Sequence, residues 1–422
     1  MSTIQSITGM SDVLPNEVPL WQYLEKTARA HFEHYGFAEI RTPVLEDTRL
    51  FSRGIGENSQ VVQKEMYTFL DKGGDSVTMR PEGTASVMRA YLEHSLMARD
   101  PITKLYYQGP MFRYERPQKG RLRQFHQIGV ELLGIDSPLA DAEVVIMMDR
   151  LIGLLGLSQY HLEVNSLGTL EERKPYLERL VAFLDQYKTQ LCEDCQKRLV
   201  SNPLRILDCK IATCKSLAEQ APTILDSLTD ASKREFQQFQ SALDRANVSY
   251  IVNPRIVRGL DYYEKTAFEF TSDQLGSQSA FCAGGRYNRL AEELGGKSVP
   301  AVGFSLGCER IVLLLAERQQ ETTMKGELNG VYVIPMSETC FGPCVELLQQ
   351  LRDQGIKAEM DYAVKSMKSQ MRRANKLDFR WAVIMGDDER QKGVVALKNL
   401  ENGEQTEVVG SQLAAKLAPG PV

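Results

Sequence analysis

The clearest change in the pattern of hydrophobic and polar positions lies near residue 325. An apolar run at 311–316 is followed by a polar stretch at 317–330, and a new strand-like run begins at 331. Beyond this break, strand-like segments alternate with segments of helical periodicity, which is typical of a sheet covered by helices. The pattern predicts a compact α/β domain over residues 326–422, with strands at 331–334, 381–385 and 394–400 and helices at 342–354 and 366–377.

Residues 168–250 differ from their surroundings because helical periodicity replaces strand-like alternation. Thr169 and Glu172 have the spacing of a helix-capping box, and apolar residues follow them at helical intervals. Ser232 and Glu235 repeat that spacing. The sequence therefore predicts one sheet-based domain over residues 1–325, interrupted by a helical insertion at 168–250. Strand-like segments on both sides of the insertion lie at 104–113, 123–133, 267–271 and 300–304.

Composition and charge narrow the class of protein. The 422 residues are 43% hydrophobic and 25% charged, which is ordinary for a globular enzyme. The longest apolar run is far too short to span a membrane, and the N-terminus does not have the pattern of a signal peptide, so we expect a cytoplasmic protein. The net charge of −5 gives no overall attraction for nucleic acid, so RNA binding would have to come from local basic patches.

One short motif suggests a hydrolase but lacks its catalytic base. Residues 303–307, Gly-Phe-Ser-Leu-Gly, match the G-x-S-x-G nucleophile elbow. That chemistry requires a histidine later in the chain, whereas the last of the five histidines is His161. We therefore do not expect Ser305 to act as a nucleophile.

The segment 112–131 carries the strongest functional signal. Pro117 and Gly120 separate two strand-like runs, which predicts a hairpin with a long tip. A buried hairpin face would surround its phenylalanine with apolar residues, whereas here the neighbours on the same face are polar or glycine. This face is therefore expected to meet a ligand. Strand alternation places on it Arg123, Phe125, Gln127 and Glu131.

The residue types in this region suit a nucleotide and a small cationic or amphoteric molecule. Guanidinium groups bind phosphate oxygens and an aromatic ring stacks on a base, as Arg113, Arg121 and Phe125 could do. A carboxylate such as that of Glu131 binds a cationic group. Three further segments add cations, carboxylates and phenols, at 78–84, 257–263 and 284–287.

On these residues, the sequence resembles the histidyl-tRNA synthetase family of class II aminoacyl-tRNA synthetases over essentially its full length. The segment 40–46, with Pro43, resembles the dimer-forming first motif of the class, 112–131 the second and 303–310 the third. Arg258-Gly-Leu-Asp-Tyr-Tyr263 and Gly284-Gly-Arg-Tyr287 resemble the two signatures of the histidine family. Two positions depart from the family pattern, Asn288 in place of the usual Asp and Cys308 in place of an aliphatic residue, and neither is expected to remove activity.

The resemblance implies an α+β fold in which the antiparallel catalytic sheet of class II synthetases carries a helical insertion and is followed by an α/β anticodon-binding domain. It implies a homodimer that activates L-histidine with ATP and transfers it to the 3′ end of tRNA(His), with Mg²⁺ entering bound to ATP. The alternative is a histidine-sensing regulatory subunit of ATP phosphoribosyltransferase, a paralogue that lacks the C-terminal domain and has lost the arginines that contact ATP. The arginines and the extra domain of this chain favour the enzyme.

The same resemblance implies a role for each candidate residue. The catalytic residues would be Arg113, which holds the α-phosphate, and Arg258, which replaces a metal ion at the reacting phosphate. ATP would be bound by Arg113, Arg121, Phe125 and Arg310. Histidine would be enclosed by Glu82, Gly83, Thr84, Gln127, Glu131, Tyr262, Tyr263 and Tyr287.

Candidate contacts with tRNA lie in two places. In the C-terminal domain, four basic residues recur at intervals that align them along one face of a helix. Such a face is equally consistent with simple solvation, and the resemblance to an anticodon-binding domain favours RNA. Gln118, at the hairpin tip, would face the acceptor end of the tRNA. The four basic residues are Lys365, Lys368, Arg372 and Lys376.

Four of the eight cysteines have a spacing compatible with a zinc site in the insertion. Cys192-x2-Cys195 is followed after thirteen residues by Cys209 and after four more by Cys214. The alternative is four unrelated thiols, and it is favoured because members of the family do not all carry this set. Zinc therefore stays an open alternative at this point.

Overall fold

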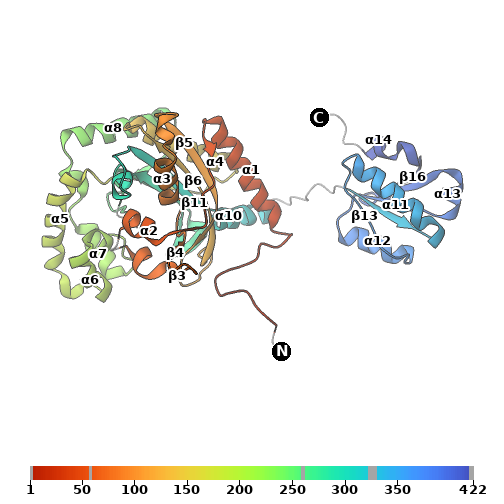
Figure 1. Cartoon of the computed structure of the whole chain (residues 1–422), viewed down its shortest axis with the longest axis horizontal. Coiled ribbons are helices and arrows are strands. Elements are labelled where there is room, and N and C mark those ends of the chain that lie inside the picture. Colours follow the sequence, from red (N-terminus) through yellow and green to blue (C-terminus); the bar gives the residue numbers. More distant parts are fainter. Residues whose placement is uncertain (1–2, 57–58, 258–261, 322–329, 418–422) are drawn as a thin grey trace. The chain divides into compact units, whose positions relative to one another are not determined.

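The computed structural model describes residues 3–56, 59–257, 262–321 and 330–417. The chain forms two compact units, Met1–Glu321 and Thr322–Val422 (Figure 1). The predicted boundary at 325/326 falls in the stretch 322–329, outside the described residues.

An eight-stranded, mainly antiparallel sheet organises the first unit. Its central strands β5, β6, β11, β10, β9 and β7 run antiparallel to their neighbours, and the short edge strands β1 and β8 pair in parallel. The strand-like segments predicted on both sides of the insertion lie within this sheet. In spatial order the strands are β1 (Ala38–Glu39), β5 (Thr103–Phe112), β6 (Gln124–Leu133), β11 (Ala301–Gly307), β10 (Ala280–Arg286), β9 (Glu264–Thr271), β7 (His161–Ser166) and β8 (Ile251–Val252).

Helices bury one face of this sheet. Helix α4 contributes Val144, and α1 contributes Phe32, to a core that also contains Phe268 and Phe304 of the sheet. Because this face is closed by apolar packing, a polar ligand site has to lie on the other face. The covering helices are α1 (Val18–His34), α4 (Pro138–Leu154) and α10 (Cys308–Glu321).

The other face of the sheet carries a second core, in which α3 packs with aromatic side chains of the strands. A separate three-stranded antiparallel sheet, in the order β2-β4-β3, lies at the start of the chain and leads into α3. Its last strand delivers the segment 80–84 to this face of the large sheet. The elements are β2 (Leu45–Asp47), α2 (Thr48–Ile55), β3 (Tyr67–Leu70), β4 (Ser76–Met79), α3 (Thr84–Glu93) and α9 (Leu290–Glu293).

The insertion is helical, as predicted. Thr169 and Glu172 form the predicted capping box at the start of α5. The second prediction was wrong by one turn, because Thr229 rather than Ser232 is the N-cap of α8 and accepts the backbone N–H of Ser232. Figure 1 shows α5, α6 and α7 grouped at the side of this unit away from α1. The helices are α5 (Leu170–Asp185), α6 (Glu193–Ser201), α7 (Ala212–Gln220) and α8 (Asp230–Arg245).

The second unit is a five-stranded sheet in the order β13-β12-β14-β15-β16, with helices packed on it. The first three strands are parallel and the last two antiparallel, which confirms the α/β alternation. Among the described residues, no helix is long and apolar enough to cross a membrane. The elements are β12 (Val331–Pro335), α11 (Glu338–Asp353), β13 (Ala358–Met360), α12 (Met367–Lys376), β14 (Trp381–Met385), α13 (Asp387–Lys392), β15 (Val394–Asn399), β16 (Gln405–Val409) and α14 (Leu413–Leu417).

Candidate active site

Glycines leave room for large polar side chains on the open face of the large sheet. A Cβ atom on Gly83 would lie 2.2 Å, and one on Gly129 2.4 Å, from the ring of Tyr107 on β5. A Cβ on Gly303 would lie 2.0 Å from the carboxylate of Glu131. These distances are far below van der Waals contact, so the glycines are what allow Tyr107 and Glu131 to lie flat against the sheet.

Glu131 lies within a cluster of buried polar side chains, which we call the chamber. Thr84 Oγ1 donates a hydrogen bond of 2.7 Å to Glu131 Oε1, and the Tyr287 hydroxyl donates one to Oε2. Burial raises the pKa of Glu131 to about 8, although both hydrogen bonds act in the opposite direction. The cluster therefore holds a carboxyl group whose charged form would be stabilised by a cationic partner.

Glu82 provides a second carboxylate at the start of α3. Its side chain accepts the backbone N–H of Thr84 at 2.7 Å and that of Ala85 at 2.9 Å, so it caps the helix. Burial raises the pKa of Glu82, and the two backbone hydrogen bonds counteract that effect. The cap fixes the Glu82 carboxylate in place beside the chamber.

Three buried tyrosines pack together within this cluster. The ring centroid of Tyr262 lies 4.7 Å from that of Tyr263 and 5.6 Å from that of Tyr287, and all three side chains are buried. Gln127 of β6 donates from Nε2 to Ser305 Oγ of the adjacent strand β11 at 3.2 Å. Gln127 Oε1 is buried without a hydrogen-bond partner among the described residues, so it is an acceptor available to a ligand.

A group of arginines lies next to the carboxylates. Arg113 Nε donates to the carbonyl of Pro81 at 2.8 Å, and its guanidinium lies 5.2 Å from the centroid of the Phe125 ring. Arg121 pairs with Glu115, and Arg310 Nε donates to the carbonyl of Gly120 at 3.1 Å.

These arginines repel one another. Burial lowers the pKa of Arg310, and the charges of Arg121 and Arg113 lower it further. Burial is also the largest cause of the lowered pKa of Arg113 and of Arg121. A polyanion bound among the three guanidinium groups would relieve this repulsion, which is what the phosphates of a nucleotide supply.

The described candidate residues of the ATP and histidine sets lie together on this face. They come from β6, the residue after β5, the hairpin tip, the start of α3, the first turn of α10, and the segments just before β9 and just after β10. Arg258 lies outside the described residues. Gln118 is exposed at the hairpin tip, where its backbone pairs with that of Arg121 in both directions at 2.9 Å. In the second unit the four basic candidates are exposed on or just before α12, and Lys365 pairs with Asp361 at 3.1 Å.

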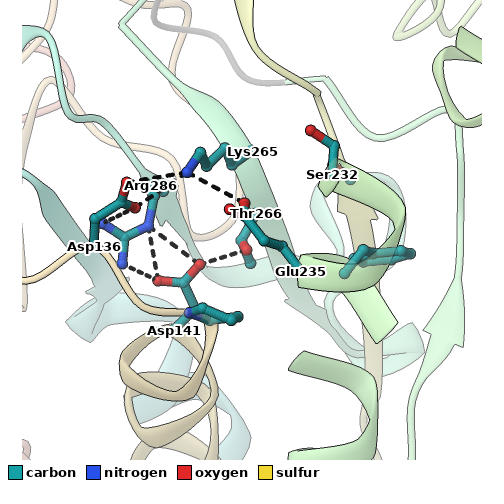
Figure 2. A pocket seen from close by; sticks show the side chains of 10 residues that line it. Asp136, Asp141, Ser232, Glu235, Lys265, Thr266 and Arg286 are labelled. Carbon is teal, nitrogen blue, oxygen red and sulfur yellow. Dashed lines mark hydrogen bonds and ion pairs between the residues drawn. The ribbon is translucent and has the colours of Figure 1, made fainter. Parts of the chain in front are cut away.

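Sequence reasoning did not find Tyr107, Ser305 as a partner of Gln127, or the ion pair of Arg286 with Asp141. Figure 2 shows Arg286 held by Asp141, which also accepts the hydroxyl of Thr266 at 2.5 Å. Arg286 and Tyr287 are consecutive, so their side chains point to opposite faces of the sheet. The ion pair with Asp141 therefore holds the Gly284–Tyr287 segment from the face opposite Tyr287. The position of Arg286 directly after the glycine pair was the available signal for this ion pair. The sequence did not identify the partner, because Asp141 on α4 is distant in sequence.

The two departures from the family pattern have clear surroundings. Asn288 Oδ1 accepts Arg286 Nη1 and the backbone N–H of Ala301, both at 3.0 Å. An aspartate would accept the same two donors, so the amide oxygen is an adequate replacement. Cys308 is buried in the core against the helix-covered face of the sheet, where a small apolar side chain fits.

Comparisons with known proteins agree with this geometry. Residues 9–311 match the family described as "Histidyl-tRNA synthetase", and residues 330–418 match the family described as "Anticodon binding domain". The chain is 47% identical over 403 residues to "Histidine--tRNA ligase" of Syntrophotalea carbinolica, covering 96% of this chain and 95% of the relative. It is 49% identical over 405 residues to the ligase of the same name from Geobacter sulfurreducens, covering 96% and 97%.

A solved structure shares the fold over nearly the whole chain. Apo histidyl-tRNA synthetase from S. aureus matches with a TM-score of 0.82 at 37% identity, covering 98% of this chain and 100% of that one. This match confirms the expected α+β core with its helical insertion and the C-terminal α/β domain. The chain therefore belongs to the histidyl-tRNA synthetase family.

Proposed function

We propose that this protein is a histidine–tRNA ligase. The observation that supports it best is the buried carboxylate of Glu131, which accepts hydrogen bonds from Thr84 and Tyr287 and lies beside buried tyrosines and three arginines. This arrangement pairs a site for a small amphoteric molecule with a site for phosphates. Relatives that cover nearly the whole chain carry the name of this activity.

The first step joins the two substrates. A carboxylate oxygen of histidine attacks the α-phosphorus of ATP, the bond to the β-phosphate oxygen breaks, and pyrophosphate leaves with its Mg²⁺. Arg113 would hold the α-phosphate beside Phe125, which stacks on the adenine, and Arg121 and Arg310 would hold the outer phosphates. Arg258 would neutralise the charge that develops on the reacting phosphate.

The amino acid is bound on the other side of the reacting atoms. Glu82 and Glu131 would meet the cationic groups of histidine, and the phenols of Tyr262, Tyr263 and Tyr287 would enclose its ring. The vacant acceptor on Gln127 suits an N–H of the substrate. Because an imidazole has two polar nitrogens, an amino acid that lacks one would leave a buried group unpaired, and the chamber would reject it.

The second step transfers histidine to RNA. The terminal hydroxyl of the tRNA attacks the carbonyl carbon of histidyl-adenylate, and AMP leaves. The exposed basic face at Lys365, Lys368, Arg372 and Lys376 would meet phosphates of the tRNA, and Gln118 would meet its acceptor end. We place this reaction in the cytoplasm, with translation, and expect a homodimer to carry it out.

The competing function is that of a histidine-sensing regulatory subunit. Such a protein would bind histidine in the same chamber but would not catalyse its activation. The three described arginines and the matched anticodon-binding domain favour the ligase. Pyrophosphate exchange measured with each of the twenty amino acids tests the choice, and we expect exchange with histidine alone. Binding of histidine with no exchange for any amino acid would establish the sensor instead.

A further inference from the structure

Four cysteine thiols from three segments meet inside the helical insertion. Cys192 is the N-cap of α6 and Cys195 lies in its first turn, Cys209 lies in the connection to α7, and Cys214 lies in the first turn of α7. Their four Sγ atoms all lie within 4.8 Å of one another. Chain segments up to 22 residues apart therefore converge on one point.

The spacing of the sulfur atoms is that of ligands around a central ion. Four thiolates at about 2.3 Å from zinc in a tetrahedron have their sulfurs about 3.8 Å apart. Cys192 Sγ and Cys209 Sγ lie 4.0 Å apart, so a contraction of about 1 Å or less across the group completes the site. A disulfide would bring two of the sulfurs to about 2 Å.

The first turns of two helices lie at the sulfur cluster. Cys192 is the N-cap of α6, and Cys195 and Cys214 lie in the first turns of α6 and α7, where backbone N–H groups have no partner within the helix. The backbone N–H of Cys192 donates to Cys214 Sγ at 3.3 Å. The N-terminal ends of two helices beside the four sulfurs therefore suit the negative charge of a zinc–thiolate group.

The insertion gains from such a cross-link. Helices α6 and α7 have nine residues each, too short to be stable alone, and the core they share is small. Cys195 and Cys214 are fully buried in that core, and Cys192 is partly exposed, which leaves a route for an ion. A closed site of four protein ligands leaves no position for a substrate, so its role is structural.

We propose that Cys192, Cys195, Cys209 and Cys214 bind one structural Zn²⁺ as four thiolates, with release of the four thiol protons. The ion would hold the start of α6, the start of α7 and the loop between them in place. This inference does not depend on the ligase activity, because it rests on the insertion alone.

The zinc site would also support the wall of the histidine chamber. Arg255 donates to the carbonyls of Ala221 at 2.6 Å and Pro222 at 3.0 Å, just after α7. Arg173 of α5 donates to the carbonyl of Tyr263 at 2.7 Å. Hydrogen bonds therefore join the insertion to Arg255, just before the Arg258–Tyr263 signature, and to Tyr263 at its end.

Metal analysis of the full-length protein tests the proposal directly. Protein purified without added metal and in the presence of a thiol reductant is expected to contain about one zinc per chain by inductively coupled plasma mass spectrometry. Mercurial titration of the cysteines should release that zinc, as followed with a colorimetric indicator. Cys195→Ala and Cys192→Ser should each lose most of the zinc.

Cys340→Ala is the matched control, because Cys340 is a fully buried cysteine in the other compact unit. It should keep the zinc content of the parent protein. Reduced parent protein that contains no zinc, and takes none up when four free thiols are titratable in the insertion, would overturn the proposal even if the variants do not fold. Two disulfides among these cysteines, or iron with inorganic sulfide, would overturn it as well.

Discussion

At the scale of single residues, Glu131 is the group whose chemistry depends most on its surroundings. Its folded-state pKa of about 8 lies above the ordinary 4.5, so the folded protein binds this proton more tightly than the unfolded chain does. The contribution of Glu131 to stability is therefore greatest at low pH and declines as pH rises from about 4.5 to about 8. A cationic ligand that pairs with the carboxylate reverses this effect.

Histidine binding is expected to strengthen with pH below about 8 through Glu131. A bound cationic group favours the carboxylate and lowers its pKa, so binding in that range releases a proton from Glu131. The affinity should gain up to about tenfold per pH unit from this group. Calorimetry in two buffers of different ionisation enthalpy measures the release. Free histidine also titrates, so Glu131→Gln supplies the baseline, and equal proton release by both proteins would contradict the assignment.

Arg258→Ala is expected to slow adenylate formation about 10²–10³-fold while histidine affinity changes little. Its charge would matter most in the transition state, when negative charge builds on the α-phosphate. Single-turnover quench-flow with saturating ATP and histidine isolates that step. Arg99→Ala, at an exposed position, is the control and should keep the parent rate. An unchanged chemical step in the Arg258 variant would remove it from the catalytic residues.

Sequence patterns identified residues whose own side chain is expected to contact a ligand. They did not identify residues whose position depends on contacts with distant parts of the chain. Glu131, Gln127 and Phe125 stood out because polar residues occupied a strand face that should be apolar. Tyr107 was missed because its role depends on Gly83 and Gly129, which meet it only after β5 pairs with β6 and α3 docks. Such contacts between distant segments leave no local pattern.

At the scale of secondary structure, the long hairpin connects both substrate sites to the surface. Strands β5 and β6 pair over ten residues each, and the tip beyond them closes with reciprocal backbone hydrogen bonds between Gln118 and Arg121. Gly120 takes a left-handed φ of 69° there and packs beside Arg310. The exposed tip is therefore held next to the group that would bind the outer phosphates.

Gln118→Ala is expected to spare amino-acid activation and to slow transfer of histidine to tRNA. The side chain is exposed at the tip, where an amide can both donate to and accept from a base edge. Loss of one such contact costs about 1–3 kcal/mol, or about 5–150-fold in transfer. Pyrophosphate exchange and aminoacylation, measured on the same preparation, separate the two steps. Lys119→Ala, at the neighbouring exposed position, is the comparison, and a Gln118 variant with parent rates in both assays would show that its side chain is not used.

Local patterns also located most elements but not all of their ends. The alternation along 123–133 and the capping box at Thr169 correspond to β6 and α5. The start of α8 was misplaced because Thr229 and Ser232 are both suitable N-cap residues. The choice between them depends on Glu172 of α5, which accepts the Ser232 hydroxyl and the Thr229 backbone N–H. Likewise, sequence spacing alone did not decide between a metal site and separate cysteines, because only folding brings the four sulfurs together.

At the scale of the whole molecule, the proposed catalytic residues and the basic helix face proposed to meet tRNA belong to different compact units. The first unit contains the chamber, the arginines and the insertion, and the second contains the exposed basic face of α12. Each has its own hydrophobic core, so each holds its residues in place independently of the other.

The first unit also leaves an apolar surface uncovered near Pro43. On the small sheet, Leu45, Phe69 and Leu70 have exposed fractions of 47%, 46% and 70%. This sheet follows the segment that resembles the dimer-forming motif of class II synthetases. Its middle strand, β4, runs directly into the segment 80–84 that carries Glu82 and Thr84. An apolar cover over this sheet would therefore steady part of the histidine chamber.

We expect that cover to be a second copy of the chain. Sedimentation equilibrium at micromolar concentration should give about twice the chain mass of 47.5 kDa. Leu70→Asp should weaken the dimer. Histidine activation should fall in parallel with the loss of dimer, because β4 pairs with β3 and continues directly into the segment 80–84. Val200→Asp, on the insertion at 85% exposure, adds the same charge at another exposed apolar position and should change neither quantity. A parent protein that sediments as a monomer and is fully active would show that the small sheet needs no partner, and a Leu70 variant that remains dimeric would place the interface elsewhere.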